Sequence, residues 1–365
     1  MSKITSIGTS LPSYKHAQES LCSFADAVYS ADAAESRKLK FLYRHSGINS
    51  RYSVIPDFSL PAQERIFFAK SDNLEPFPGI EERMTYYTRT ATPMSVEAIQ
   101  NCIEGKIGKD EITHLITVSC TGMSAPGLDL DIMEIMKLSP TLVRSSVNFM
   151  GCYAAIHAIK LADAFCRTTP KANVVVVCTE LCTLHFQKQV SADNITASLL
   201  FADGSAAMLF QSETINEGIT IDHFYSQVSF KGRKDMAWQI SSQGFLMTLT
   251  GFVPDLIKED FEQLVANALS ASGITRDEIT HWCIHPGGKK ILDTIVQSLG
   301  INTDDLRYSY KILQEYGNMS SATIVFVLKE MLAEFRESGK NSNARIFGAA
   351  FGPGLTMETF TASYG

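Results

Sequence analysis

The chain has 365 residues, of which 45% are hydrophobic and 19% are charged, and its formal net charge is −7. This length and composition allow two domains, or two closely fused halves, with a large core. The acidic balance argues against nucleic-acid binding, and apolar runs such as Val174–Cys178 are far too short to cross a membrane. Eight cysteines are scattered along the chain, several of them inside apolar runs. We therefore expect reduced thiols and a cytoplasmic protein without a signal peptide.

The first part of the chain predicts a short strand, a helical stretch and a surface excursion. Residues 4–7 are expected to form an opening strand, and residues 16–45 have a helical pattern that ends in a basic stretch. Between residues 56 and 80, several prolines and a glycine indicate an irregular surface segment. A helix over residues 95–103 and a buried strand over residues 114–119 are expected to follow.

The middle of the chain predicts buried strands around one apolar helix. Residues 147–150 lead into Gly151-Cys152, and the apolar spacing that follows predicts a mostly buried helix. Residues 174–177 are β-branched and continuous, as in a central strand. Residues 199–210 predict a strand, a turn at Asp203-Gly204-Ser205 and a second strand.

The remaining elements repeat this order. They comprise a helix over residues 260–271, a strand over 282–284, a helix over 318–335 and a strand over 345–349. Alternating strands and helices that occur twice predict an α/β protein with five layers, α/β/α/β/α. We expect two related halves, residues 1–215 with a nucleophilic cysteine and residues 216–365 with its histidine and asparagine partners.

A short duplicated segment supports the two-half organisation. The sequence DEITH occurs as Asp110–His114 and again as Asp277–His281. Gly151-Cys152 follows the first copy, and Gly317-Asn318 follows the second at almost the same spacing, each before an apolar helical pattern. A duplicated fold would bring these two positions together across a pseudo-twofold axis.

Cys152 is the candidate nucleophile. It lies where a strand is expected to pass into a helix, and a helix N-terminus carries about half a positive charge, which favours a thiolate. A neighbouring histidine would form an ion pair with the thiolate and lower the thiol pKa further. The alternative, a small buried core residue, is the interpretation for the other cysteines that lie in apolar patterns, namely Cys22, Cys102, Cys166 and Cys178.

His285 and Asn318 are the candidate partners of Cys152. His285 follows a buried strand and precedes a Pro-Gly-Gly turn, which places its imidazole at the edge of a core. A satisfied core histidine and a helix N-cap are the respective alternatives for the two residues. Together with Cys152 they match what acyl transfer needs, a thiolate to carry the acyl group and two hydrogen-bond donors for one carbonyl oxygen.

Five short motifs occur in order along the chain. They are the nucleophile segment Gly151-Cys152, the loop Leu200–Gly204, the histidine segment Ile284–Gly288, the asparagine segment Gly317–Ala322 and the glycine-rich segment Gly348–Thr359. Together they resemble the motifs of the type III polyketide synthases, the chalcone-synthase-like family of the thiolase fold, and favour a bacterial member. The match is weakest before Asp110, and Ala349-Ala350 departs from the family's GFGPGLTVET signature.

The resemblance implies a reaction. Cys152 would take an acyl starter from coenzyme A as a thioester. His285 and Asn318 would bind the thioester carbonyl of malonyl-CoA and stabilise the enolate that remains after CO2 leaves. The enolate would attack the Cys152 thioester, and repetition would build a poly-β-keto chain that cyclises to a pyrone, resorcinol or phloroglucinol. A homodimer that uses coenzyme A thioesters as substrates and has no cofactor is expected.

The resemblance also assigns a substrate cavity. Phe201 matches an aromatic gatekeeper between the coenzyme A tunnel and the cavity, for which a core residue is the alternative. Met247 falls on the second gatekeeper position, and Trp238 falls on a position that is often glycine, where an indole would shorten the cavity. The remaining expected substrate-binding residues are Cys120, Cys182, His185, Ser320 and Phe351.

Two further sets of side chains suggest ligands. The basic stretch with Arg44, His45 and Arg51 offers cations to the phosphates of coenzyme A, and a solvated helix face is the alternative. Cys178, Cys182 and His185 have a spacing that suggests zinc, but they provide only three ligands along a strand and the following loop, so we expect no metal site.

Three other functions compete with this interpretation. An initiating β-ketoacyl-acyl carrier protein synthase has the same three catalytic residue types and performs one condensation. A papain-type hydrolase needs an open cleft, which the internal repeat and the buried helix after Cys152 disfavour. An inactive binding homologue is disfavoured because all three catalytic residue types are present.

Overall fold

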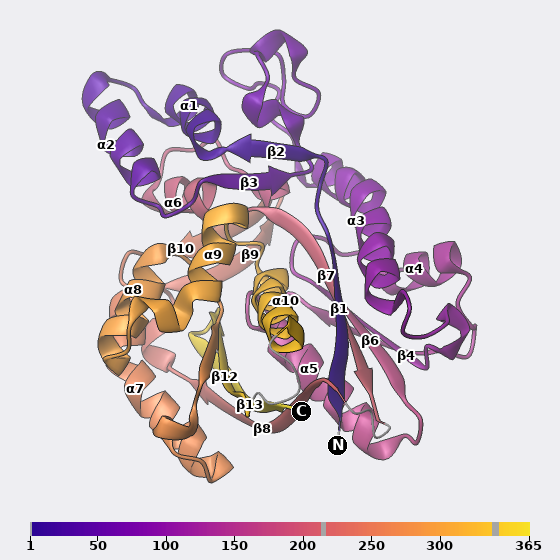
Figure 1. Cartoon of the computed structure of the whole chain (residues 1–365). Helices are drawn as coiled ribbons and strands as arrows, with labels where there is room; N and C mark the ends of the chain where they lie inside the picture. Colours follow the sequence, from indigo (N-terminus) through magenta and orange to yellow (C-terminus); the bar gives the residue numbers. More distant parts are fainter. Residues whose placement is uncertain (1, 213–216, 338–342) are drawn as a thin grey trace.

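Nine strands form one mixed sheet whose two halves repeat each other in a computed structural model that describes residues 2–212, 217–337 and 343–365 (Figure 1). The first half has the order β1-β7-β6-β4-β5 and the second half the order β8-β13-β12-β11. The first-half strands are β1 (Lys3–Ser10), β4 (His114–Ser119), β5 (Val143–Asn148), β6 (Asn173–Leu181) and β7 (Asp203–Gln211). The second-half strands are β8 (Ile219–Val228), β11 (His281–Ile284), β12 (Arg345–Gly352) and β13 (Thr356–Tyr364).

Strand directions follow the same rule in both halves. β4 runs parallel to β6, as β11 does to β12. β7 is antiparallel to β6 and β1, and β13 is antiparallel to β12 and β8. The halves meet where β8 pairs with Lys3 and Ile4 of β1. The expected boundary between residues 215 and 216 lies outside the described residues.

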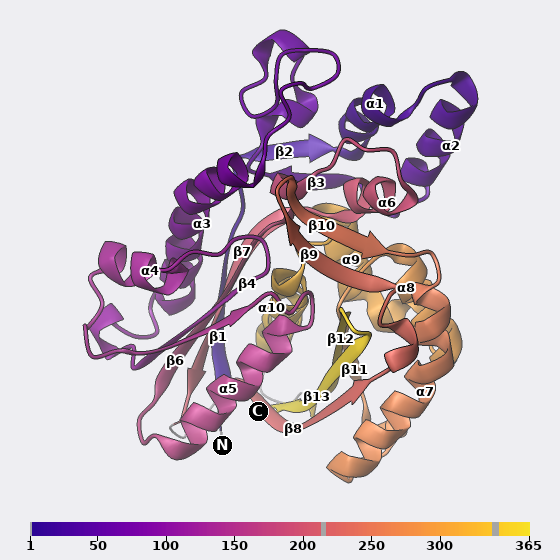
Figure 2. The same cartoon turned by 180° about the vertical axis from the view of Figure 1, so that it is seen from behind.

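Helices form three layers around the two sheet halves (Figures 1 and 2). α3 (Ile80–Ile103) and α4 (Leu128–Met136) cover the outer face of the first half, and α7 (Val253–Ser272) and α8 (Lys289–Leu299) cover that of the second. α5 (Ala154–Thr168) and α10 (Ser321–Glu337) lie between the halves. The predicted α/β/α/β/α arrangement is therefore confirmed.

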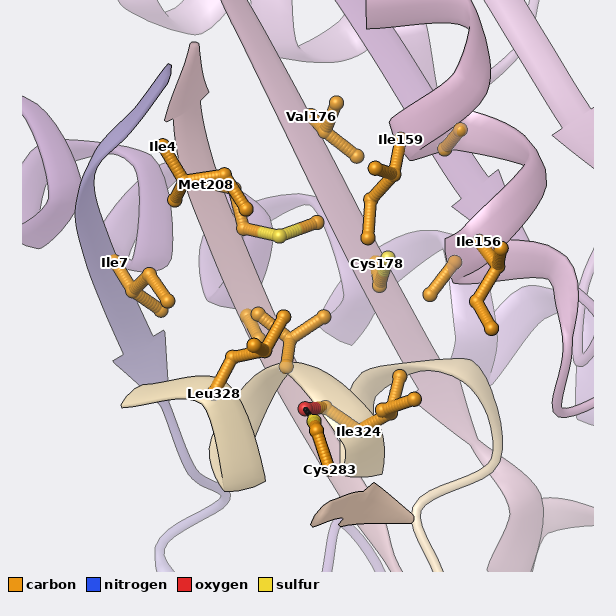
Figure 3. Close-up of a cluster of buried hydrophobic side chains, with 14 of the residues drawn as sticks. Ile4, Ile7, Ile156, Ile159, Val176, Cys178, Met208, Cys283, Ile324 and Leu328 are labelled. Carbon is orange, nitrogen blue, oxygen red and sulfur yellow. Dashed lines mark hydrogen bonds between the residues drawn. The ribbon is translucent and has the colours of Figure 1, made fainter. Parts of the chain in front are cut away.

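The central core is made by side chains from both halves. Figure 3 shows Ile4, Val176 and Met208 in one cluster with Ile156 of α5 and Ile324 of α10. All five side chains are fully buried. Such burial contributes roughly 25 cal/mol per Å² of apolar surface removed from water. The shared core therefore contributes a large part of the stability of the two central helices.

The two DEITH copies adopt the same local structure. Each forms a short 3-10 turn, and a strand then begins at His114 or at His281. In each copy the threonine hydroxyl lies 2.8 Å from Nδ1 of the following histidine. The same hydroxyl accepts a backbone N–H at 2.9 Å, from Asn173 in the first half and from Arg345 in the second. The repeat in the sequence is thus a repeat in structure.

The prediction for residues 199–210 is wrong. Helix α6 (Ala192–Leu200) extends to the end of this apolar run, and a single strand, β7, begins at Asp203. The Asp203-Gly204 pair does not form a turn, because the buried Asp203 carboxylate accepts hydrogen bonds from the backbone N–H groups of Val54 and Thr183. A local turn signal is overridden by these tertiary hydrogen bonds.

Several predicted helices have different bounds. The helical stretch 16–45 is two helices, α1 (Gln18–Tyr29) and α2 (Ala33–Arg44), separated where the Asp32 carboxylate caps α2. The helix expected at 95–103 begins at Ile80, because the chain continues through Pro93 without a break. The helix expected at 260–271 begins at Val253.

A smaller region covers one end of the two halves. Its elements are β2 (Tyr14–Ala17), β3 (Ser50–Ser53), α1, α2, α6 and α9 (Arg307–Tyr316), with the hairpin β9 (Met236–Ser241) and β10 (Gly244–Leu249) below (Figure 1). α1 and α2 share an apolar cluster with the segment that follows β6. No described helix is long and apolar enough to span a bilayer.

Gly8→Ala should destabilise the fold, because an added Cβ at this position of β1 would lie 2.2 Å from the Cys102 backbone nitrogen and 2.4 Å from the Ala98 carbonyl oxygen. The helix backbone of α3 has to shift, and such overpacking typically lowers the free energy of unfolding by about 1–3 kcal/mol. Urea denaturation measures the change. Gly251→Ala is the control, since no atom lies within 4 Å of its added Cβ. Equal unfolding free energies for the two variants would contradict this prediction.

Candidate active site

Cys152 lies in the short connection between β5 and α5, as the sequence predicted. Gly151 has φ 88°, and a Cβ there would lie 2.4 Å from Cδ of Pro353, so only glycine fits. The Gly151 N–H donates to the sulfur of Cys120 at 3.0 Å. These constraints present the partly buried Cys152 side chain at the beginning of α5.

His285 directly follows β11, and its backbone N–H extends the ladder to the Ala349 carbonyl at 2.8 Å. The chain then turns, with the Gly287 N–H donating to the His285 carbonyl at 3.0 Å. The imidazole is only 1% exposed, and neither ring nitrogen has a hydrogen-bond partner among the described residues. A buried polar group without a partner is rare and is consistent with a ligand contact.

Asn318 precedes α10 by three positions and is held on both sides. Its backbone pairs with Leu200 and Ala202, at 2.9 Å for each hydrogen bond. Its side-chain oxygen accepts the Ser320 N–H at 2.8 Å, immediately before the helix, which begins at Ser321. The amide nitrogen donates at 3.3 Å to the Gly287 carbonyl, beside His285.

The three predicted catalytic side chains line one cavity, which we call the catalytic cavity. Seven of the eight predicted substrate-binding residues line it too, and His185 is the exception. The full lining is Cys120, Thr121, Gly151, Cys152, Cys182, Phe201, Met236, Trp238, Met247, Leu249, His285, Gly287, Ile291, Asn318, Ser320, Phe351 and Pro353. Most of these side chains are apolar, so the few polar groups face a poorly hydrated space.

Burial is the largest influence on the pKa values of Cys152 and His285. It raises the pKa of the Cys152 thiol to about 12, and hydrogen bonds from Ser320 and Asn318 oppose that rise only in part. It also lowers the pKa of His285 to about 3. Burial therefore opposes the predicted thiolate–imidazolium pair, because removal from water penalises both charged forms.

A second cavity lies next to the catalytic cavity, between α1, α6 and the segment after β6. The two cavities share four lining residues, Cys182, Phe201, Trp238 and Met247, which we call the partition. Within it, Trp238 of β9 and Met247 of β10 are cross-strand neighbours. The Trp238 indole N–H donates to the Cys120 carbonyl at 2.7 Å, which fixes the position of the ring in the partition.

His185 lines the second cavity and not the catalytic one. Its Nε2 lies 2.7 Å from the Thr121 carbonyl, and its Nδ1 accepts the Phe245 N–H at 3.0 Å. Its ring is stacked on Phe245 and meets Trp238 edge to face. Both nitrogens are used, so His185 supports the partition and does not offer a free donor to substrate.

The three predicted coenzyme A residues do not lie in one environment. Arg44 and His45 are exposed at the end of α2, where the His45 ring stacks on Phe41. Arg51 is 3% exposed, and its guanidinium donates to the carbonyls of Ser198 and Phe201. This arrangement gives Arg51 a role in holding the Phe201 segment, and it turns the guanidinium away from a phosphate at the surface.

Sequence reasoning missed some groups at this site. Thr121, Met236 and Leu249 line the catalytic cavity without belonging to a recognisable motif. Glu180 is buried behind it, and an isolated acid in an apolar strand carries no specific signal. No cluster of three or more potential metal ligands occurs in the part of the chain that the structure describes.

Comparisons with known proteins agree with this geometry. Residues 1–214 match the family described as "Chalcone and stilbene synthases, N-terminal domain", and residues 224–363 match the corresponding C-terminal domain. A "Putative chalcone synthase" of Bacillus subtilis is 28% identical over 378 residues, which cover 100% of this chain and 99% of that protein. "Probable polyketide synthase 1" of Dictyostelium discoideum is 28% identical over 97% of this chain, which spans only 11% of that protein.

The fold is also that of a solved relative. The C-terminal type III polyketide synthase domain of Steely1, a type I/III hybrid from Dictyostelium, superposes with a TM-score of 0.90 at 26% identity, and 99% of each chain is covered. The predicted family, fold class and enzyme type are thereby confirmed. The chain belongs to the chalcone and stilbene synthase family, has the thiolase-like fold of the type III polyketide synthases, and is an acyltransferase of that kind.

Proposed function

We propose that this enzyme is an iterative polyketide synthase that condenses an acyl-CoA starter with malonyl-CoA. Cys152 takes the acyl group as the CoA thiol leaves. Malonyl-CoA then loses CO2, and its enolate carbon attacks the Cys152 thioester and releases the sulfur. Repetition lengthens the poly-β-keto chain, which cyclises to a pyrone, resorcinol or phloroglucinol.

The observation that carries this proposal is the common cavity of Cys152, His285 and Asn318. Decarboxylation of malonate requires stabilisation of negative charge on the enolate oxygen, and a pair of donors in a poorly hydrated site provides it. Neither ring nitrogen of His285 has a partner among the residues that the structure describes, and the Asn318 amide donates at 3.3 Å to a neighbouring carbonyl. Both groups can therefore turn their donors to one thioester oxygen.

The alternative is an initiating β-ketoacyl-acyl carrier protein synthase with a single condensation. The partition and the mostly apolar lining of the catalytic cavity favour repeated extension, since a growing chain needs apolar space. Incubation with malonyl-CoA, a panel of acyl-CoAs and no carrier protein decides between the two. Products with several two-carbon units support the proposal, whereas dependence on a carrier protein and one extension support the alternative.

Substrates and assembly complete the proposal. Arg44 and His45 are the exposed residues proposed to contact the phosphates of coenzyme A, and Arg51 holds the Phe201 segment through the Ser198 and Phe201 carbonyls. No cofactor besides the coenzyme A thioesters is proposed. We also propose a cytoplasmic homodimer.

Cys152→Ala should abolish acyl loading and condensation, because the other thiols of the catalytic cavity, Cys120 and Cys182, do not lie at the start of α5. Slow decarboxylation of malonyl-CoA should remain, since His285 and Asn318 are intact. Mass spectrometry of the protein and release of labelled CO2 measure the two effects. Substantial polyketide from this variant would remove Cys152 from the mechanism.

Ser320→Ala should slow alkylation of Cys152 by iodoacetamide, because the Ser320 hydrogen bond lowers a thiol pKa that burial has raised. At a fixed pH near 8 the thiolate fraction, and with it the rate, should fall several-fold, since one pKa unit is a tenfold change. Peptide mapping identifies the labelled thiol, and Cys152→Ala defines the background. An unchanged rate would show that Ser320 does not stabilise the thiolate.

Trp238→Gly should open the partition between the two cavities. It removes an indole held by the Cys120 carbonyl, and roughly 150–250 Å² of aromatic surface leaves the wall. Longer products, or acceptance of longer starters, are expected. The free energy of unfolding should fall by at most about 3–5 kcal/mol, the usual range for such truncations. Product masses from one starter are compared between folded wild type and variant. Identical product and starter profiles would show that Trp238 does not limit the cavity.

A further inference from the structure

A buried carboxyl group that the proposed chemistry does not use lies behind the catalytic cavity. Glu180 is the penultimate residue of β6 and is fully buried. None of the ion pairs among the described residues includes it. A glutamate is almost never fully buried without a paired charge, and its hydrogen bonds then decide whether it is tolerated.

The hydrogen bonds of Glu180 reach two different walls of the cavity. One carboxyl oxygen accepts the Cys120 backbone N–H at 2.9 Å and the Thr121 hydroxyl at 3.1 Å, in the loop that follows β4. The other oxygen accepts a hydrogen bond from the hydroxyl of Ser321, the first residue of α10. The same carboxyl therefore ties the loop to the segment that carries Asn318.

The loop after β4 also holds the nucleophile segment. The sulfur of Cys120 accepts the N–H of Gly151, the residue before Cys152, at 3.0 Å. The Cys120 carbonyl accepts a hydrogen bond from the indole N–H of Trp238. Glu180 itself does not line the catalytic cavity. It can therefore affect the reaction only through the residues that it holds.

The charge of Glu180 acts on the same groups. Burial raises the pKa of this carboxyl to about 7, although its hydrogen bonds lower it. When ionised it raises the pKa of the Cys152 thiol. The other titratable groups that face it, from α3, the loop after β4, β6 and the turn after β6, are Tyr87, Cys120, Cys178 and Cys182.

The proposed reaction creates a thiolate and then an enolate, both of them negative. A carboxylate in the same poorly hydrated wall would oppose both charges. A protonated carboxyl keeps one donor and its acceptor capacity, so it can maintain the hydrogen bonds without that repulsion.

We propose that Glu180 is a positioning residue for the condensation, because its carboxyl joins the Cys120 loop to the first turn of α10 and so sets Cys152 against Asn318. This role presupposes the condensation proposed above.

Glu180→Gln tests the charge, because an amide has the shape and the hydrogen-bonding capacity of the neutral acid. At pH 6 the variant should keep kcat within about twofold of wild type, and above pH 7 it should lose the decline that ionisation of Glu180 imposes. That decline approaches about tenfold for each pH unit above the pKa. Superposable pH profiles of kcat for wild type and variant, or a folded variant that is inactive at every pH, would overturn the proposal.

Alkylation of Cys152 provides a readout that does not depend on polyketide formation. In Glu180→Gln the rate above pH 7 should exceed that of wild type, since the neighbouring negative charge is gone. If wild-type enzyme forms no condensation product, the proposed function fails, but this alkylation comparison still decides whether Glu180 acts on Cys152. Equal rates overturn that action.

Two further variants complete the experiment. Asp203→Asn is the matched control, since Asp203 is a buried carboxyl in the adjacent strand whose partners Val54 and Thr183 do not line the catalytic cavity. It should retain the wild-type pH dependence, and a shift equal to that of Glu180→Gln would overturn the assignment.

Ser321→Ala removes one hydrogen-bond partner of Glu180 and leaves the carboxyl in place. The value of kcat should therefore fall with KM nearly unchanged, even if Glu180→Gln does not fold. An unchanged kcat in Ser321→Ala would also overturn it.

Discussion

The packing of α5 against α10 is the interaction on which the rest of the structure depends. Both helices are buried between the two sheet halves, and alanines such as Ala155 and Ala322 leave little side-chain bulk in the core that they share. Closely packed protein interiors allow little displacement of one helix relative to another. Since Cys152 precedes one helix and Asn318 precedes the other, their relative position is set by the same core that stabilises the fold.

The position of the site at the ends of these two buried helices also explains the pKa shifts of its side chains. Groups carried by the ends of buried elements are removed from water, so burial favours the neutral forms of Cys152, His285 and Glu180. A charge that develops during the reaction then meets few mobile counter-ions or waters. Hydrogen bonds from fixed donors become the main means of stabilising it, which is the condition under which such donors are most effective.

The partition shows that a hairpin outside the large sheet helps to shape the catalytic cavity. Trp238 and Met247 belong to a hairpin outside the large sheet, yet they form part of the wall of the catalytic cavity. The hairpin is held through the Trp238 indole at Cys120 and through His185 at the Phe245 N–H. The hairpin therefore contributes directly to the size and shape of the catalytic cavity.

The sequence by itself determined the repeated α/β order, the nucleophile segment and the two partner segments. These features are local, since a duplicated DEITH segment, a glycine before Cys152 and a Pro-Gly-Gly turn after His285 are visible in a short window. The tertiary structure alone decided that Arg51 faces the protein interior, that His185 supports the partition, and that Glu180 joins two walls of the site. It also replaced the expected turn at Asp203 with a continuous strand. In each of these cases the deciding hydrogen-bond partners or packing contacts are far away in the chain, and burial rather than local pattern sets the energy of a polar group.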